Sequence, residues 1–269
     1  MHPMKKMMGR REAQVLAYLQ MRKQTTLRAE DLTVPFQLTR KQERELVHRM
    51  ARSGVIVRVR PGLYLAPRQL PLGVVWSPDE ATALGALMED CGGRFQVCGP
   101  NAFNRYGFEE QIPNRVYAYN NRISGERTIG AVALTLIKVA DARLGDTEPL
   151  QAAGGLTIPY SSRARTLVDA VYDWSRFDGL PRAFGWIRAE LKAKRIPVAD
   201  LVRLTLRYGD IGTIRRMGAL LDREDAPSRI LGQLERALRP SKSLIPWIPT
   251  RPKRGKVDRR WGVMWNEQV

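Results

Sequence analysis

The chain is poor in the residues from which metal sites and many catalytic centres are built. It has two cysteines, Cys91 and Cys98, and two histidines, His2 and His48, among 269 residues. Two cysteines are too few for a disulfide framework or a four-ligand zinc site, so we interpret both as ordinary apolar thiols of a cytoplasmic protein. Neither histidine has the neighbours of a metal site or a catalytic triad. We therefore expect neither a metal nor another cofactor.

Motifs of nucleotide-dependent enzymes are also missing. The sequence has no P-loop, no G-x-G-x-x-G, no C-x-x-C and no nucleotidyltransferase pattern of Gly-Ser followed by paired aspartates. Glu190-Leu191-Lys192 formally matches the E-x-K half of a nuclease motif. That motif requires a strand, whereas its neighbours predict a helix, so we interpret Glu190 as part of a surface ion pair. We expect no catalytic activity; a nuclease using Glu190, Lys192 and Asp178 is an alternative.

Long apolar runs are absent as well. The longest uncharged apolar stretch, about residues 129–137, is far shorter than the ~18 residues of a membrane span. The start, MHPMKKMMGRREAQ, has basic residues but no apolar stretch behind them, so we expect no signal peptide. The hydrophobic fraction of 43% is that of a globular chain. The length suits one large domain or two ordinary ones.

Positive charge, in contrast, is abundant and unevenly spread. The formal net charge is +18, of which residues 1–70 carry +10, residues 71–160 carry −3 and residues 161–269 carry +11. Segregated positive charge is typical of proteins that bind polyanions, although a merely soluble basic protein is an alternative. We divide the chain into residues 1–70, a middle domain over 71–238 and a basic tail over 239–269.

The first seventy residues follow the order of a winged helix-turn-helix. Apolar spacing predicts helices over residues 10–23 and 27–32, and a third from an N-cap at Thr39 through Arg52, with Glu43 near the position that completes a capping box. GVIVRVRPGLYLAP, residues 54–67, then alternates and turns at Pro-Gly, which predicts a hairpin. Three helices followed by a hairpin predict a DNA-binding domain.

The hairpin has one apolar and one basic face. Alternation places Val55, Val57 and Val59 on one side, and Ile56, Arg58 and Arg60 on the other. An isolated hairpin is marginally stable, so the valine face must pack on the helices. The arginine face then remains free to meet a negative partner.

The third helix has a matching polarity. Leu46, Val47 and Met50 form its predicted buried stripe. Glu45, within the opposite face, either accepts from cytosine or pairs with Lys41 or Arg49. Arginine and lysine on that face suit guanine edges or phosphates in the major groove. The predicted DNA-binding residues are Thr39, Arg40, Lys41, Arg44, His48 and Arg52 of the helix, with Arg58 and Arg60 of the wing.

The remaining chain predicts a larger mixed α/β domain that ends in a helical bundle, so the fold class is α+β. Residues 95–98 are a short apolar run, and expected strands are 116–119, 129–139 and 156–159. Expected helices begin near Asp79, at Asn101 and after a cap at Ser161 or Ser162, and continue over 182–194, 198–208, 211–221 and 228–238.

The tail combines basic residues with tryptophans. Between Arg239 and Arg260 it has eight basic residues and one acidic residue, interleaved with or followed by Trp247, Trp261 and Trp265. Such a tail either packs its tryptophans on the body or stacks them on bases. Together with basic residues of the middle domain it offers a further surface for nucleic acid or another partner: Arg163, Arg165, Arg215, Arg216, Lys253 and Arg254.

Three stretches resemble one known family. They are G-x-I-x-R-V-x-P-G-L-Y at 54–64, GPNAFNRYGFEEQIP at 99–113 and PYSSRARTLVDAV at 159–171. The first resembles the winged helix of the AbiEi antitoxins of type IV toxin–antitoxin systems, and the other two resemble segments of that family's larger domain. The resemblance spans roughly residues 8–235.

The resemblance implies a cytoplasmic DNA-binding antitoxin with a role in phage resistance. Such a protein represses its own operon, binds inverted repeats with one or two chains per site, and counteracts a nucleotidyltransferase-like toxin; a stable complex with that toxin is not implied. The further basic surface is then also a candidate antitoxic surface. The same winged helix occurs in many bacterial regulators, so a transcriptional regulator without a toxin is the alternative.

Overall fold

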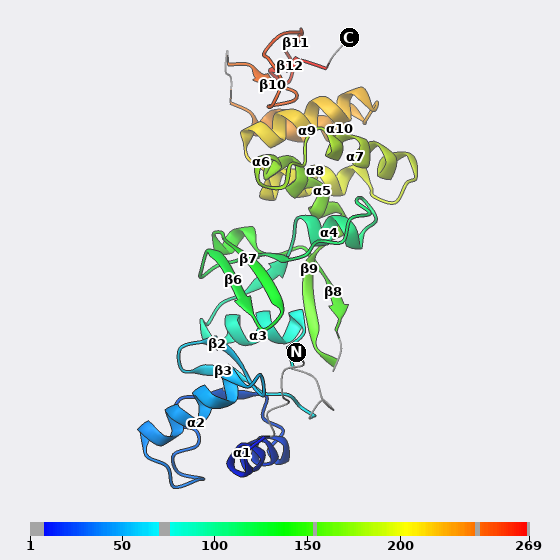
Figure 1. Cartoon of the computed structure of the whole chain (residues 1–269). Coiled ribbons are helices and arrows are strands. Elements are labelled where there is room, and N and C mark those ends of the chain that lie inside the picture. Colours follow the sequence, from blue (N-terminus) through cyan, green and yellow to red (C-terminus); the bar gives the residue numbers. More distant parts are fainter. Residues whose placement is uncertain (1–7, 70–75, 153–154, 240–242, 268–269) are drawn as a thin grey trace, which may run out of the picture. The chain divides into compact units, whose positions relative to one another are not determined.

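The computed structural model describes residues 8–69, 76–152, 155–239 and 243–267 (Figure 1). Residue contacts divide the chain into two compact units. Unit 1 comprises Met1–Phe95, Asn114–Ala140 and Leu150–Ile158; unit 2 comprises Gln96–Pro113, Asp141–Pro149 and Pro159–Val269. The predicted boundary at 70/71 lies outside the described residues, and the one at 238/239 stays a prediction. No helix among the described residues is long and apolar enough to cross a membrane.

Unit 1 begins with a small helix-and-sheet core. Its elements are α1 (Arg10–Met21), β1 (Thr26–Arg28), α2 (Arg40–Arg52), β2 (Val57–Arg60) and β3 (Leu63–Leu65). The strands form an antiparallel sheet in the order β1-β3-β2. Leu46, Val47 and Met50 of α2 are buried in a core with Val15 and Leu16 of α1, which confirms the predicted stripe.

The expectation of a helix over residues 27–32 is wrong. Leu27 lies in strand β1, whose register pairs it with Tyr64 of β3, and residues 29–37 form turns. Leu27 and Leu32 are both buried, as a short helix would also require. Two apolar residues this close in sequence fit a strand followed by a turn as well as a helix, and pairing with β3 decides between them.

Two further details differ from expectation. Gln42, and not Glu43, completes the capping box: its backbone N–H donates to the Thr39 hydroxyl at 3.3 Å, and its side chain accepts from the Thr39 N–H at 2.9 Å. Glu43 is buried and accepts from the Leu32 N–H at 3.4 Å, and burial raises the pKa of its carboxyl. Ile56 was expected on the face of Arg58 and Arg60 but is buried. It precedes β2, so the strand alternation does not apply to it, and its N–H donates to the Met50 carbonyl at the end of α2.

The rest of unit 1 includes helix α3 (Glu80–Asp90), which begins near Asp79 as expected and is capped by it, and three strands, β5 (Val116–Asn120), β6 (Gly125–Ile129) and β7 (Val132–Lys138). The strand expected over 129–139 is β7, which begins three residues later than expected. Ile129 pairs with Val132 across a two-residue turn in which Gly130 has φ +64°, a value that glycine adopts readily. β5 pairs parallel with β7.

Unit 2 holds most of the helices (Figure 1). Its elements, in part shared with unit 1 at strand ends, are β4 (Phe95–Val97), α4 (Pro100–Arg105), β8 (Thr147–Gln151), β9 (Thr157–Ser161), α5 (Arg163–Tyr172), α6 (Trp174–Phe177), α7 (Arg182–Lys192), α8 (Val198–Tyr208), α9 (Ile211–Arg223) and α10 (Ser228–Ala237). β4 pairs parallel with β9. The mixed α+β class and the helical region after the central mixed sheet are confirmed.

The sequence did not reveal β6 and β8. Both are edge strands of the central sheet. β6 is largely exposed, and β8 contains Pro149 and carries a mostly exposed pattern. Edge strands tolerate proline and polar residues on both faces, so neither strand shows the alternation that marks a half-buried one.

The tail folds onto the body of unit 2. Residues 245–265 contain β10 (Ile245–Pro246), β11 (Lys256–Asp258) and β12 (Val263–Trp265) in the order β10-β12-β11. Trp247 and Trp261 are fully buried, and Trp247 stacks on Phe184 with ring centroids 3.7 Å apart. The packed interpretation of these two tryptophans is therefore confirmed.

Candidate functional site

A basic groove opens between α2 and the hairpin of unit 1. It has a volume of about 390 Å³, and it is lined by Arg28 of β1, Arg40, Arg44 and His48 of α2, and Arg58 of β2. Tyr64, Val47 and the Pro61-Gly62 turn supply apolar wall, and Glu30 and Glu43 are the acidic lining residues. The structure thus brings three of the six predicted helix residues and one of the two predicted wing arginines to the same cavity, whereas Thr39, Lys41 and Arg52 do not line it.

Helix α2 presents these groups because its other face is anchored. Its core stripe is buried, whereas Lys41, Arg44, His48 and Arg52 are exposed. Arg52 lies outside the groove and lines a different hollow with Arg49, which donates to Glu12 of α1 at 3.4 Å. Thr39 serves the start of the helix through its cap.

One ion pair lies at the rim of the groove. Arg40 Nη2 is 3.1 Å from Glu30 Oε2, and both side chains are largely exposed. Exposed pairs of this kind contribute about 0–1 kcal/mol, so a phosphate can displace the carboxylate at little cost. Arg40 therefore remains available to a polyanion.

The two wing arginines are separated. The register of β2 against β3 shifts between Arg58, which pairs with Tyr64, and Arg60, which pairs with Leu63. Such a bulge changes the direction of the side chains that follow it. Arg58 lines the groove, whereas the Arg60 guanidinium binds Asp90 of α3, so the expectation that both arginines are free on one face is wrong for Arg60.

Asp90 is held by two arginines. Arg60 donates to it through Nε and, at 2.7 Å, through Nη2, and Arg28 Nη1 donates to Oδ1 at 2.8 Å. Its side chain is only 4% exposed. Hydrogen bonds from Arg60 hold the pKa of the Asp90 carboxyl below its usual range. No local pattern links residues 30 and 62 positions apart, so sequence reasoning missed this contact.

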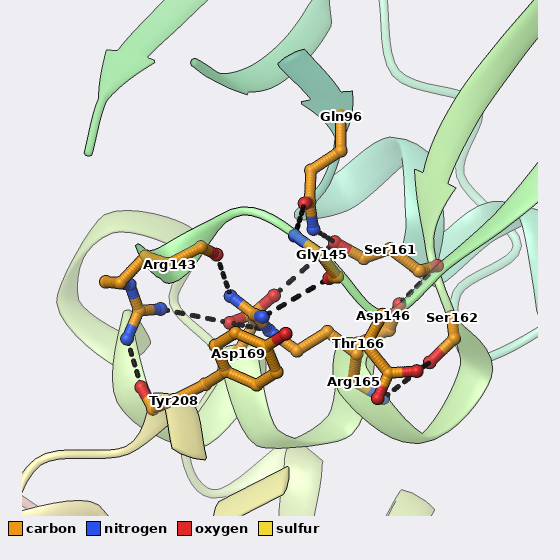
Figure 2. Close-up of polar contacts among 10 residues, drawn as sticks. All are labelled: Gln96, Arg143, Gly145, Asp146, Ser161, Ser162, Arg165, Thr166, Asp169 and Tyr208. Atoms are coloured by element: carbon orange, nitrogen blue, oxygen red, sulfur yellow. Dashed lines mark hydrogen bonds and ion pairs between the residues drawn. The ribbon is translucent and has the colours of Figure 1, made fainter. Parts of the chain in front are cut away.

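Unit 2 contains a buried polar network around α5 (Figure 2). Arg165 has no exposed side-chain surface; its Nε donates to Asp169 Oδ1 at 2.9 Å and its Nη2 donates to the Arg143 carbonyl at 3.0 Å. Arg143 Nη2 donates to the same carboxylate at 3.2 Å. The Arg165 guanidinium also lies 3.5 Å from the Tyr208 ring centroid.

The network extends to the central strands of unit 2. Gln96 of β4 donates to the Ser161 hydroxyl at 2.8 Å and accepts from the Gly145 N–H at 2.8 Å (Figure 2). These contacts tie the start of α5 to β4 and to the loop after residue 143. Arg165 is thus a structural residue and not part of a surface, which corrects the prediction for this position.

Glu190 is likewise buried, at 2% exposure, and its partners are Arg163 at 3.1 Å and Arg195 at 2.7 Å. Burial raises the pKa of its carboxyl, but the two arginines outweigh this, so the net shift is downward. The surface pair predicted for Glu190 is therefore a buried one. It lies on helix α7, and the described residues contain no cluster of three or more potential acidic, histidine or cysteine metal ligands.

Two more predicted surface cations are buried under the tail. Arg215 Nη1 donates to the Ser243 carbonyl at 3.1 Å, and Arg216 Nη2 donates to the Pro246 carbonyl at 3.1 Å. Burial lowers the pKa of Arg216 to about 10. Both residues hold the tail in place and cannot form an open surface. Lys253 and Arg254 are exposed, as that prediction requires, and Arg163 is half-buried.

Comparison with known proteins identifies the fold alone. No protein-family model matches the chain, and no curated protein matches its sequence. Among solved structures, the chain is similar to the crystal structure of the Rv2827c protein from Mycobacterium tuberculosis, with a TM-score of 0.55 and 16% identity. The similarity covers 93% of this chain and 89% of that one, so it extends over nearly the whole mixed α+β fold.

Proposed function

We propose that this chain is a DNA-binding antitoxin of the AbiEi type, which represses its own operon and counteracts a nucleotidyltransferase-like toxin. The observation that carries the DNA-binding half is the basic groove, where Arg40, Arg44 and His48 of one helix face Arg58 of the wing. A helix fits the major groove of B-DNA, where arginine pairs with guanine edges or phosphates. The wing then contacts the backbone beside that groove.

We assign the antitoxic half to the residues after 70. Its support is the resemblance of residues 99–113 and 159–171 to the AbiEi larger domain. In line with that resemblance, we propose that this half acts without catalysis, in the cytoplasm, as a monomer or as a dimer assembled on inverted repeats.

A reporter and a rescue assay in cells test the two halves separately. The wild type should repress a reporter driven by the promoter of the chain's own gene, and Arg44→Gln should lose this repression. Arg127 is exposed and lies outside the groove, so Arg127→Gln should still repress. Expression of the adjacent gene alone should inhibit growth, and co-expression of this chain should restore it. Repression without any rescue would favour a transcriptional regulator that has no toxin partner.

A further inference from the structure

Asp90 places a negative charge directly behind the basic groove. Arg28, which lines the groove, and Arg60, which precedes its Pro61-Gly62 wall, both bind this carboxylate. Asp90 is the last residue of α3, where the helix dipole disfavours an anion. The hydrogen bonds from the two guanidiniums compensate for this position.

The contact changes the charge that the groove presents. Asp90 partly neutralises both arginines and occupies donors of each, Nη1 of Arg28 and Nε and Nη2 of Arg60, so these groups offer less to a phosphate although both side chains are about half exposed. Within the part of the chain that the structure describes, no carboxylate of comparable burial forms an ion pair with Arg40, Arg44 or Arg58, and the pair of Arg40 with Glu30 is exposed. The groove is thus divided into available cations and two cations that Asp90 withholds.

We propose that Asp90 is a counter-charge that withholds Arg28 and Arg60 from bound DNA and so limits sequence-independent binding. The proposal rests on the proposed function. Affinity for arbitrary DNA comes almost entirely from neutralised phosphates, whereas base contacts add the sequence-specific part. Removing two cations from the phosphate-binding set therefore lowers binding to arbitrary DNA more than it lowers discrimination. Asp90 would raise the ratio of operator to non-operator affinity without touching DNA.

Asp90→Asn in the full chain tests this directly. Asparagine keeps the shape and one acceptor oxygen but loses the charge. With one or two arginines released to phosphates, the log–log salt slope of binding to a scrambled duplex should steepen by about 0.9 to 1.8. The gain in affinity over wild type should then be about 3 to 12 times larger at 50 mM than at 200 mM salt. The ratio of scrambled to operator Kd should fall.

Three controls separate this effect from net charge and from misfolding. Glu89→Gln makes the same charge change at the preceding, exposed position of α3 and should leave the slope near that of wild type. Asp90→Glu keeps the charge and should also bind like wild type. Adding Arg28→Gln and Arg60→Gln to Asp90→Asn should abolish the gain, and thermal melting confirms that each variant folds.

The alternatives give distinct results. An Asp90→Asn variant that folds and binds with the wild-type slope would overturn the proposal while leaving DNA binding intact. An equal gain from Glu89→Gln would also overturn it, because net charge alone would explain the effect. If the wild type bound neither duplex, the proposed function would fail as well.

Discussion

Replacing Asp169 by asparagine should strongly destabilise unit 2. Asp169 is 1% exposed and accepts from Arg165 at 2.9 Å and from Arg143 at 3.2 Å. Arg165 has no exposed side-chain surface, so the substitution leaves an uncompensated guanidinium that water cannot reach. Breaking a buried pair by removing one partner costs about 3–5 kcal/mol. With a urea m value of about 2 kcal/mol/M, the unfolding midpoint should fall by about 2 M.

Asp200→Asn is the matched control. Asp200 pairs with Arg203 at 3.3 Å on α8, and both side chains are about half exposed. The same substitution at this exposed pair should cost at most about 1 kcal/mol. Urea unfolding followed by circular dichroism compares the two variants with wild type. A loss below about 1 kcal/mol for Asp169→Asn would refute the conclusion that Arg165 and Asp169 form a buried structural pair.

Three further predictions concern the tail, the wing and pH. Gly218→Ala should destabilise the chain by about 1–3 kcal/mol, because a Cβ there would overlap the buried ring of Trp261; thermal melting measures the loss, and an unchanged melting temperature would contradict the packing. Arg58→Gln should reduce the magnitude of the salt slope of DNA binding by about 0.9, and Arg60→Gln by less than half of that; equal reductions would place both arginines on phosphates. The pKa of Asp90 is lowered in the folded chain, so its stabilising contribution is present above the unfolded pKa and is lost as pH falls through the folded pKa. The difference in urea midpoint between wild type and Asp90→Asn should therefore shrink below pH 4, and a difference that grew in acid would contradict this sign.

The regular helices and the stripe of α2 follow from the sequence. Helices α7 to α10 lie where apolar spacing predicts them, because periodicity reports which face of a helix is buried. Leu46, Val47 and Met50 are buried for the same reason. Arg44 and His48 then face away from that core, and a hairpin must follow next to α2. Arg40, Arg44 and His48 of that helix therefore line one groove with Arg58 of the hairpin.

What the sequence did not reveal depends on contacts between distant residues. Arg165, Arg215 and Arg216 look like surface cations, since arginine is seldom fully buried. Each is buried because a carboxylate or backbone carbonyls from another segment satisfy its donors. Arg60 is diverted from the groove by Asp90, thirty positions later. Periodicity describes one element at a time and contains no signal for such partners.

The measurement that tests the central claim most directly is a fluorescence-anisotropy titration of the full chain with DNA from upstream of its own gene. A scrambled duplex, a salt series and Arg44→Gln accompany it. We expect tight, salt-sensitive binding that prefers the upstream sequence. Arg44→Gln should weaken the binding free energy by about 1–3 kcal/mol and lose part of that preference. Binding with a salt slope near zero, or no difference between wild type and Arg44→Gln, would contradict the assignment of the basic groove as the DNA-binding site.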